Sequence, residues 1–500
     1  MSEPVSGTDR IVAQEPLTLS RLKAVSVRGG VASVLAMVVT QLFRLIIIAA
    51  LARLLSPSDF GVIAMTMGVL SVGIVFRDVG LSSATIQRED LTNSQVNTLF
   101  WVNLAFGAAA TLVACACAPL VAAFFDDPRL VAVTRVLSLS FVLGSLAAQH
   151  GALLTRHLRF GINAKIQIGA TLLSGLLAVV LARAGAGYWA LVLQLIASDL
   201  LTAVFVWGYS DWRPVRPRFD PSVRPMLTYG GYLVQFGLLC YLALNASVLL
   251  LGRYWGAHLL GQYNRADILT RTLLGYISQP IGNVAGPALS RLQGEPEVYA
   301  RYYFRCIEIM GALSFPLGAA CVVLAPDLVR VVLGPQWEQA GTLMRYLAPG
   351  MCVQPIMTST GWLYMSSGRV RRMLHWGVIG WGALGAATLV GLLGGAEGVT
   401  IAYSSALILL VAPCMQYAFK GTGLTLNMLW RACTAPMLSA LAAALVAGAV
   451  QILLQGQSVW LRLPVSASAL AVAYALMLLV VFRQGRAILD ILAHLRSPRT

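Results

Sequence analysis

Charge is scarce in this sequence. Only 11% of its 500 residues are Asp, Glu, Lys or Arg, and 58% are hydrophobic, whereas soluble domains carry roughly 25% charged residues. The mean hydropathy is +0.75. Apolar stretches recur from residue 31 to residue 482, and about 20 such residues suffice for a helix to cross a hydrocarbon core. The chain is therefore predicted to be an integral membrane protein without a substantial soluble domain.

The apolar runs also lack the alternation of polar and apolar residues that transmembrane barrel strands show. Residues 31–55 and 439–454 are continuously apolar, so the predicted class is all-helical. The first 27 residues carry Glu3, Asp9 and Glu15 and have no short apolar core. We therefore expect no cleavable signal peptide, with the first span acting as its own insertion signal.

Metal-binding and disulfide patterns are missing as well. The eight cysteines lie inside or at the ends of apolar segments, Cys115 and Cys117 form C-A-C and not C-x-x-C, and the five histidines are scattered. We interpret the cysteines as small buried residues. No metal site and no cofactor are predicted.

Hydropathy and helix-breaking residues predict fourteen membrane spans. They are centred in residues 31–53, 60–79, 98–123, 133–155, 167–184, 188–208, 228–251, 258–281, 307–325, 341–364, 373–393, 397–418, 433–454 and 464–482.

The distribution of Lys and Arg predicts the orientation. With both termini in the cytoplasm, most of the 36 Lys and Arg residues fall in cytoplasmic connections, as the positive-inside rule requires. The opposite connections hold only Arg53, Arg129, Arg183, Arg253, Arg330 and Arg462. The net charge of +16 is therefore expected to lie along one membrane face and not to mark a nucleic-acid site.

An internal repeat indicates duplication. LARLLSPSDFG (51–61) aligns with LGRYWGAHLLG (251–261) and pairs Gly61 with Gly261, and further matches follow in the same order. Because each copy would hold six spans, the copies share one orientation. We predict two six-helix bundles related by a pseudo-twofold axis along the membrane normal, with the last two helices outside the repeat.

This repeat predicts how the chain is divided. The longest polar connection, DWRPVRPRFDPSVRP, has four Pro and four Arg and is interpreted as the linker between the bundles. The predicted parts are a cytoplasmic tail (1–27), an N-terminal lobe (28–209), the basic cytoplasmic linker (210–225), a C-terminal lobe (226–420), helices 13 and 14 (421–482) and a cytoplasmic tail (483–500).

Arg44 is the most informative charge inside a predicted span. A charge at mid-bilayer costs roughly 2.5–3.5 kcal/mol on insertion scales and so faces protein or water. Gln41 precedes Arg44 by three residues and shares its helix face. Binding a ligand in a polar cavity is one interpretation, and bonding to carbonyl groups of a neighbouring helix is the other.

Span 8 carries Arg265, Asp267 and Arg271. The spacing of Asp267 and Arg271 favours an intrahelical ion pair, which would leave Arg265 as the better candidate for ligand binding. The buried charges of the first half are mainly arginines, and its acids are few. A cavity so lined suits an anion, in particular a phosphate or pyrophosphate, which the planar donors of arginine bind bidentately.

Five further polar residues are weaker candidates. Arg77 and Asp78 close span 2, where an arginine that reaches toward the membrane surface is an equally good account. Gln149, Gln235 and Asn245 lie within spans, where amides commonly bond across helices.

Three motifs resemble those of a known family. The pattern LxRLLxPxDFG ends span 1, FRDVGLSSATIQRED (76–90) follows span 2, and LGQYNRA (260–266) opens span 8. With fourteen spans in two bundles, residues 25–485 are similar to Wzx-type oligosaccharide flippases of the multidrug/oligosaccharidyl-lipid/polysaccharide exporter superfamily. The likeness is to the branch that serves exopolysaccharides such as colanic acid.

The resemblance implies a function in the bacterial inner membrane. An undecaprenyl-pyrophosphate-linked oligosaccharide would move from the cytoplasmic to the periplasmic leaflet by alternating access around a cationic cavity. Arg44 and Arg265 would bind the pyrophosphate, with Gln41, Arg77 and Arg271 as further candidates. Implied partners are membrane lipids, a polysaccharide polymerase and export machinery, and helices 13 and 14 would shape a groove for the lipid tail.

Two other functions are weighed against it. A cation-coupled drug or metabolite antiporter of the same superfamily needs a buried acid in the first bundle, and none lies near the centre of spans 1 to 5. A polysaccharide polymerase or ligase is an enzyme, for which we expect a long extracytoplasmic loop and a catalytic pair. The sequence shows neither, so a transporter is predicted.

Overall fold

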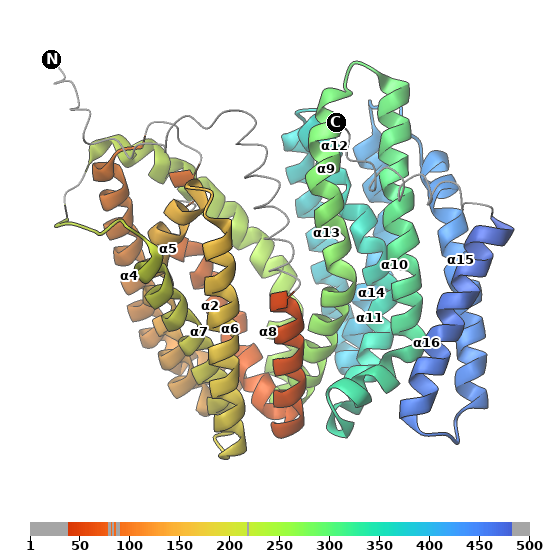
Figure 1. The fold of residues 1–500 in the computed structure, drawn as a ribbon, viewed down its shortest axis with the longest axis horizontal. Coiled ribbons are helices and arrows are strands. Elements are labelled where there is room, and N and C mark those ends of the chain that lie inside the picture. Colours follow the sequence, from red (N-terminus) through yellow and green to blue (C-terminus); the bar gives the residue numbers. More distant parts are fainter. Residues whose placement is uncertain (1–38, 79–81, 83–84, 87–90, 218–219, 483–500) are drawn as a thin grey trace. The chain divides into compact units, whose positions relative to one another are not determined.

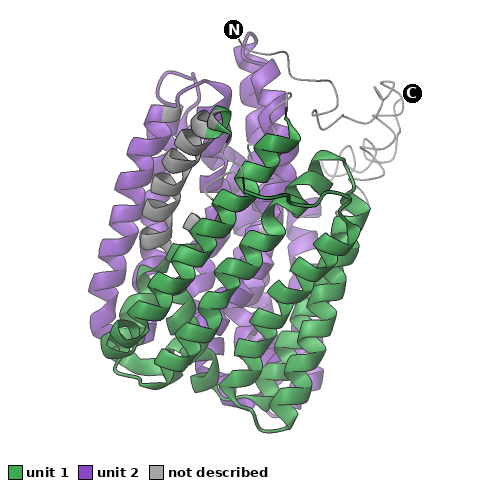
Figure 2. Cartoon of the chain, turned by 90° about the vertical axis from the view of Figure 1, so that its left-hand side faces the viewer, with its two compact units in different colours: residues 1–261 green, residues 262–500 purple. Residues whose placement is uncertain are grey.

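The computed structural model describes residues 39–78, 82, 85–86, 91–217 and 220–482, and among these the chain is all-helical, without a β-strand (Figure 1). The predicted all-helical class is confirmed. The chain forms two compact units, residues 1–261 and 262–500, which Figure 2 colours separately. The predicted lobe boundaries stay predictions.

Unit 1 consists of long helices that follow one another closely. After a helix that includes residues 39–54 come α2 (Pro57–Asp78), α4 (Asn93–Phe125), α5 (Arg129–Arg156), α6 (Phe160–Arg183), α7 (Tyr188–Tyr209), the short η1 (Pro221–Val223) and α8 (Arg224–Leu274), which continues into unit 2. Helix α5 packs against α4, α7 and α2, and α6 packs against α7. Leu154, Ile166 and Val206 form a buried cluster between α5, α6 and α7.

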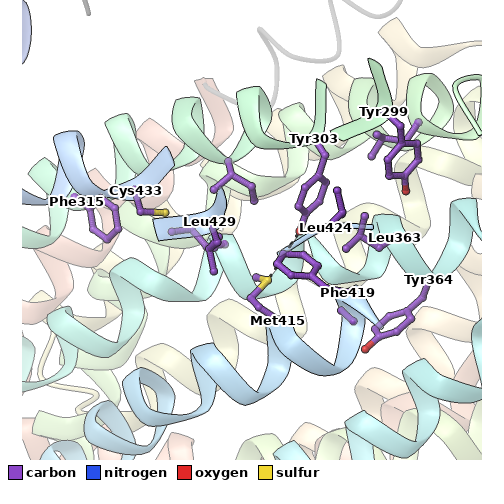
Figure 3. Packing of buried hydrophobic residues seen from close by; sticks show 14 of the residues in the cluster. Tyr299, Tyr303, Phe315, Leu363, Tyr364, Met415, Phe419, Leu424, Leu429 and Cys433 are labelled. Carbon is purple, nitrogen blue, oxygen red and sulfur yellow. Dashed lines mark hydrogen bonds between the residues drawn. The ribbon is translucent and has the colours of Figure 1, made fainter. Parts of the chain in front are cut away.

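Unit 2 holds the rest of the helices. They are η2 (Gly275–Ile277), α9 (Ser278–Arg291), α10 (Pro296–Val332), η3 (Pro335–Trp337), α11 (Glu338–Thr358), α12 (Thr360–Ser366), α13 (Val370–Gly391), η4 (Leu392–Gly394), α14 (Gly395–Phe419), α15 (Leu426–Leu453), α16 (Val459–Leu476) and η5 (Met477–Val481). In its core, the Tyr303 hydroxyl lies 2.8 Å from the Ser359 hydroxyl, and Phe419 and Met415 pack nearby (Figure 3).

Eight helical stretches among the described residues are long and apolar enough to cross a membrane. Four are α4, α5, α6 and α7, and the others are α10, the stretch Arg371–Phe419 that contains α13 and α14, α15, and Val459–Val481. The chain is therefore a multi-pass membrane protein. The predicted number of fourteen spans is not confirmed by this measure.

Local sequence explains where several helices begin and break. Thr92 and Gln95 form a capping box at the start of α4, because each side chain accepts a hydrogen bond from the other residue's backbone N–H at 3.2 Å. Pro296 opens α10, where its missing N–H costs nothing. Helix α8 is broken at Gly256, whose φ of 76° is readily adopted only without a Cβ. The break separates predicted spans 7 and 8.

Two glycines that the internal repeat aligns lie in reciprocal contacts within unit 1. A Cβ on Gly61 would overlap the carbonyl oxygen of Ala257, and a Cβ on Gly261 would overlap that of Pro57. Pro57 and Ala257 each precede their own glycine by four residues. A twofold-related pair makes such exchanged contacts. This reciprocity supports the duplication predicted from the sequence.

The polar segment before α8 is fixed to the start of α4. The Asn97 amide accepts from the Val215 N–H at 3.0 Å and donates to the Arg216 carbonyl at 3.1 Å. The Trp101 indole donates to the Val215 carbonyl at 2.8 Å, and the Asp220 N–H donates to the Thr98 hydroxyl at 3.1 Å. The predicted linker is therefore bonded to α4 at Val215, Arg216 and Asp220.

An ion pair joins the last helices to the rest of unit 2. Asp327 of α10 accepts from the Arg462 Nε of α16 at 2.7 Å and from the Gln451 amide of α15 at 2.9 Å. The side chains of Asp327 and Arg462 are only 6% and 19% exposed. The carboxylate thus connects three helices that pack against one another.

The glycine contacts generate a stability prediction. Gly61→Ala and Gly261→Ala should each lower the melting temperature of the purified protein in detergent, because overpacking costs about 1–3 kcal/mol. Gly208→Ala is the matched control, since no described atom lies within 4 Å of a Cβ there and alanine is favoured over glycine in helices by about 0.5–1 kcal/mol. Equal melting temperatures for all three variants would contradict the close contact.

The ion pair generates a second prediction. Arg462→Met should destabilise unit 2 by about 3–5 kcal/mol, because it leaves the buried Asp327 carboxylate without its cation. The double variant Asp327→Leu/Arg462→Met should recover much of that loss. Thermal unfolding in detergent measures both, and a double variant as unstable as the single one would show that the charge of Asp327 is not the cause.

Candidate functional site

Arg44 and Gln41 lie on the helix that includes residues 39–54, as the sequence predicts. The Arg44 side chain is exposed and that of Gln41 is half-buried, while Thr40 and Ile47 are buried. Leu42 and Ile46 of the same helix are exposed as well. The role of Arg44 in anion binding stays a prediction.

The charges of predicted span 8 lie on the second arm of α8, after the break at Gly256. The Arg271 Nε donates to both carboxylate oxygens of Asp267 at 2.8 Å, so the intrahelical pair expected from the spacing is confirmed. Arg265 is half-buried, and its guanidinium donates to the neutral Asn264 amide oxygen at 2.8 Å. Arg271 is thus held by an ion pair within its own helix.

The weaker candidates have different surroundings. Gln149 is fully buried in α5 and accepts a hydrogen bond from the Thr85 hydroxyl at 2.9 Å, which favours the structural alternative for this amide. Asn245 is half-buried in the first arm of α8. Arg77 and Asp78 end α2, and Gln235 lies in α8, but their side chains fall outside the described part of the structure.

Within the described residues, the structure brings Asp267 and Arg271 together. Arg44 belongs to unit 1, whereas Arg265 and Arg271 belong to unit 2. A single anion site formed by all three arginines therefore stays a prediction. No group of three or more His, Cys, Asp or Glu side chains that could hold a metal ion occurs in the described part of the chain.

A cavity in unit 1 was not predicted from the sequence. It has a volume of about 410 Å³ and lies between α5, α6 and α7, and its polar lining residues are Ser82, Thr155, Asn163, Gln167, Asp199 and Thr202. The sequence does contain a pattern that could have indicated it. Asn163 and Gln167 are four residues apart, and Asp199 and Thr202 are three apart. Such spacings place polar groups on one face of an otherwise apolar helix.

The fold defines the class of protein. The chain is similar to the structure of the lipid II flippase MurJ, with a TM-score of 0.73 at 12% identity over 92% of this chain and 99% of that one. A multidrug resistance MATE family transporter of the MOP superfamily matches with a TM-score of 0.58 at 16% identity, over 79% and 95% of the two chains. The chain thus shares the fold of these two multi-pass membrane proteins.

Sequence comparison places the chain more narrowly. Residues 50–341 match the family described as polysaccharide biosynthesis protein, and the chain belongs to that family. It is 24% identical to the lipopolysaccharide biosynthesis protein WzxC of Escherichia coli K12, over 76% of this chain and 78% of the relative. It is 25% identical to the succinoglycan biosynthesis transport protein ExoT of Rhizobium meliloti, over 63% and 64%. The predicted polysaccharide-exporter family is confirmed.

The geometry of span 8 generates a test that needs no substrate. Asp267→Ala and Arg271→Ala should each lower the melting temperature, whereas the double variant should be less destabilised than the two losses summed, because contacting residues couple by about 0.5–3 kcal/mol. Arg265→Ala combined with Asp267→Ala is the comparison pair, for which we expect additive losses. Additivity for Asp267 with Arg271 would mean that their contact contributes nothing to stability.

Proposed function

We propose that the protein is a flippase for an undecaprenyl-pyrophosphate-linked oligosaccharide in the synthesis of an exopolysaccharide or lipopolysaccharide. The observation that carries the proposal is membership of the polysaccharide biosynthesis family together with a fold similar to that of a lipid II flippase over nearly the whole chain. One relative in sequence is named a succinoglycan biosynthesis transport protein. A sugar carried on a lipid is a substrate that agrees with both the polysaccharide family and the flippase fold.

In this proposal the chain crosses the bacterial inner membrane fourteen times with both termini in the cytoplasm. Two six-helix bundles related by the internal repeat alternate access to the two leaflets, and the reciprocal contacts of Gly61 and Gly261 support the repeat. Helices α15 and α16 lie outside the bundles and would contact the lipid tail. A polysaccharide polymerase and export machinery would take the product on the periplasmic side.

Arginines would supply the affinity for the pyrophosphate. Arg44 is exposed on its helix, and Arg265 donates to the neutral Asn264 amide in the contact described above. Arginine binds phosphate oxygens with two parallel N–H donors. Gln41, Arg77 and Arg271 would add further donors. Transport from the cytoplasmic to the periplasmic leaflet follows the direction of polysaccharide export.

The test is movement of a fluorescent polyprenyl-pyrophosphate oligosaccharide into the protected leaflet of proteoliposomes. Arg44→Ala should lower the rate at least about tenfold, because a hydrogen bond to a charged group contributes about 1.5–3 kcal/mol. Arg44→Lys should restore part of the rate, since lysine keeps the charge and loses the fork of donors. Arg183→Ala, an exposed arginine at the end of α6, is the matched control and should transport normally.

Two outcomes would contradict the proposal. Normal transport by both Arg44 variants would remove this residue from the anion site. Failure of the wild-type protein to move the lipid, with uptake of a cationic drug instead, would favour the antiporter of the same superfamily.

A further inference from the structure

The cavity between α5, α6 and α7 has the size of a site for a small organic molecule. Its volume is about 410 Å³, and ligand pockets in proteins commonly enclose about 300–1,000 Å³. The coordination shell of a single bare cation is much smaller, and the described residues offer no group of three or more His, Cys, Asp or Glu side chains that could hold a metal. Size and composition therefore favour an organic ligand.

Small residues of α5 make the space. Gly144, Ala147, Ala148 and Gly151 line the cavity and lie on one face of the helix, because they are spaced by three and four residues. A Cβ on Gly151 would have no described atom within 4 Å. The small side chains of α5 therefore leave this space open, and α6 and α7 on the opposite side carry most of the polar groups.

Those polar groups suit hydroxyl groups and disfavour phosphate. The Asn163 amide donates one N–H to the Thr155 hydroxyl at 3.1 Å, and the Thr202 hydroxyl donates to the Ser198 carbonyl at 2.8 Å. An amide has a second N–H and a carbonyl oxygen, and a hydroxyl also accepts, so together with Gln167 and the Asp199 carboxylate the lining holds both donors and acceptors. Among the described residues of the lining, Asp199 is the one that is formally charged, and its negative charge repels a phosphate. A sugar ring, with hydroxyl groups on several sides, matches such a mixed set of donors and acceptors.

The cavity extends from one end of the helices toward their middle. Thr155 lies in the last turn of α5 and Asn163 in the first turn of α6, whereas Asp199 is in the middle of α7. In the proposed topology that end of the helices is cytoplasmic, where the head group of the lipid enters.

We propose that this cavity is a sugar-binding subsite, which holds a hexose ring of the head group while arginines outside it hold the pyrophosphate. The proposal rests on the proposed function. Asn163 and Gln167 bind ring hydroxyls, and Asp199 accepts from one or two more. The subsite then contributes affinity that depends on the sugar and not on the lipid diphosphate.

The test compares two probes in nanodiscs, undecaprenyl pyrophosphate and the same lipid carrying a single hexose, with glucose, galactose and N-acetylglucosamine tried in turn. The wild-type protein should bind at least one hexose-bearing lipid roughly tenfold more tightly than the bare diphosphate, as two or three hydrogen bonds to sugar hydroxyls would give. An excess of the same free hexose should reduce that advantage without affecting the bare lipid.

Two variants should remove the advantage of the sugar. Gly151→Leu fills the cavity, and Asn163→Ala/Gln167→Ala removes both amides. In each, the bare diphosphate should bind as in the wild type and the hexose-bearing lipid no better. Gly161→Leu is the matched control, because a Cβ on Gly161 also has no described atom within 4 Å and this residue does not line the cavity. Melting temperatures confirm that each variant is folded.

The outcomes separate the subsite from the flippase function. If the wild type binds neither probe, the proposed function fails and the subsite fails with it. If it binds both probes equally, or if the sugar advantage survives in both variants, the subsite is wrong and the flippase function stands. If Asp199→Asn removes a dependence of binding on sodium ions or on pH while the sugar advantage is kept, the cavity is a cation site and the proposal is overturned.

Discussion

The structure depends on one constraint, which is that a polar group among apolar helices must find its partner within the chain. Thr66 and Thr270 donate to the carbonyl oxygens four residues before them, whereas the Thr111 hydroxyl of α4 also reaches the Ser138 carbonyl of α5 at 2.9 Å. Asp327 binds Arg462 across two helices. Charge is scarce in the sequence because each charge inside the membrane needs an arrangement of this kind.

The same constraint separates structural polar residues from candidates for binding. Asp267 and Arg271 satisfy each other on one helix, and their pairing accounts for their place in α8. Asn163, Gln167 and Asp199 line a cavity, and Asn163 also donates to the Thr155 hydroxyl. Polar residues that are costly in an apolar helix and that face open space are the residues that a function can explain.

The sequence predicts what depends on neighbours along the chain. Hydropathy located the helices because the membrane selects for length and composition, and the Asp267–Arg271 pair followed from a spacing of four residues. Breaks were harder to predict. The stretch 341–364 was expected as one helix but is divided into α11 and α12, and span 8 ends at Leu274, before η2 and a separate helix, α9.

Contacts between distant parts of the chain could not be predicted from the sequence. Asp327 and Arg462 are 135 residues apart, and neither was singled out as a partner of the other. The cavity needs three helices packed together before Asp199 and Asn163 share a space. The internal repeat is an exception. The alignment of residues 51–61 with residues 251–261 predicted that these segments are structurally equivalent, and the reciprocal contacts of Gly61 and Gly261 agree with that prediction.

A division of the head group between two kinds of site follows from the chemistry of the residues. In the proposed function, arginines would recognise the pyrophosphate and would contribute affinity without selecting a glycan. Neutral amides and a carboxylate would recognise the arrangement of hydroxyl groups, because a site built to hydrogen-bond a hydroxyl is left with unpaired polar groups when that hydroxyl is absent. Selection among glycans would then belong to the cavity of unit 1, and relatives that export different polysaccharides would be expected to differ there more than at their arginines.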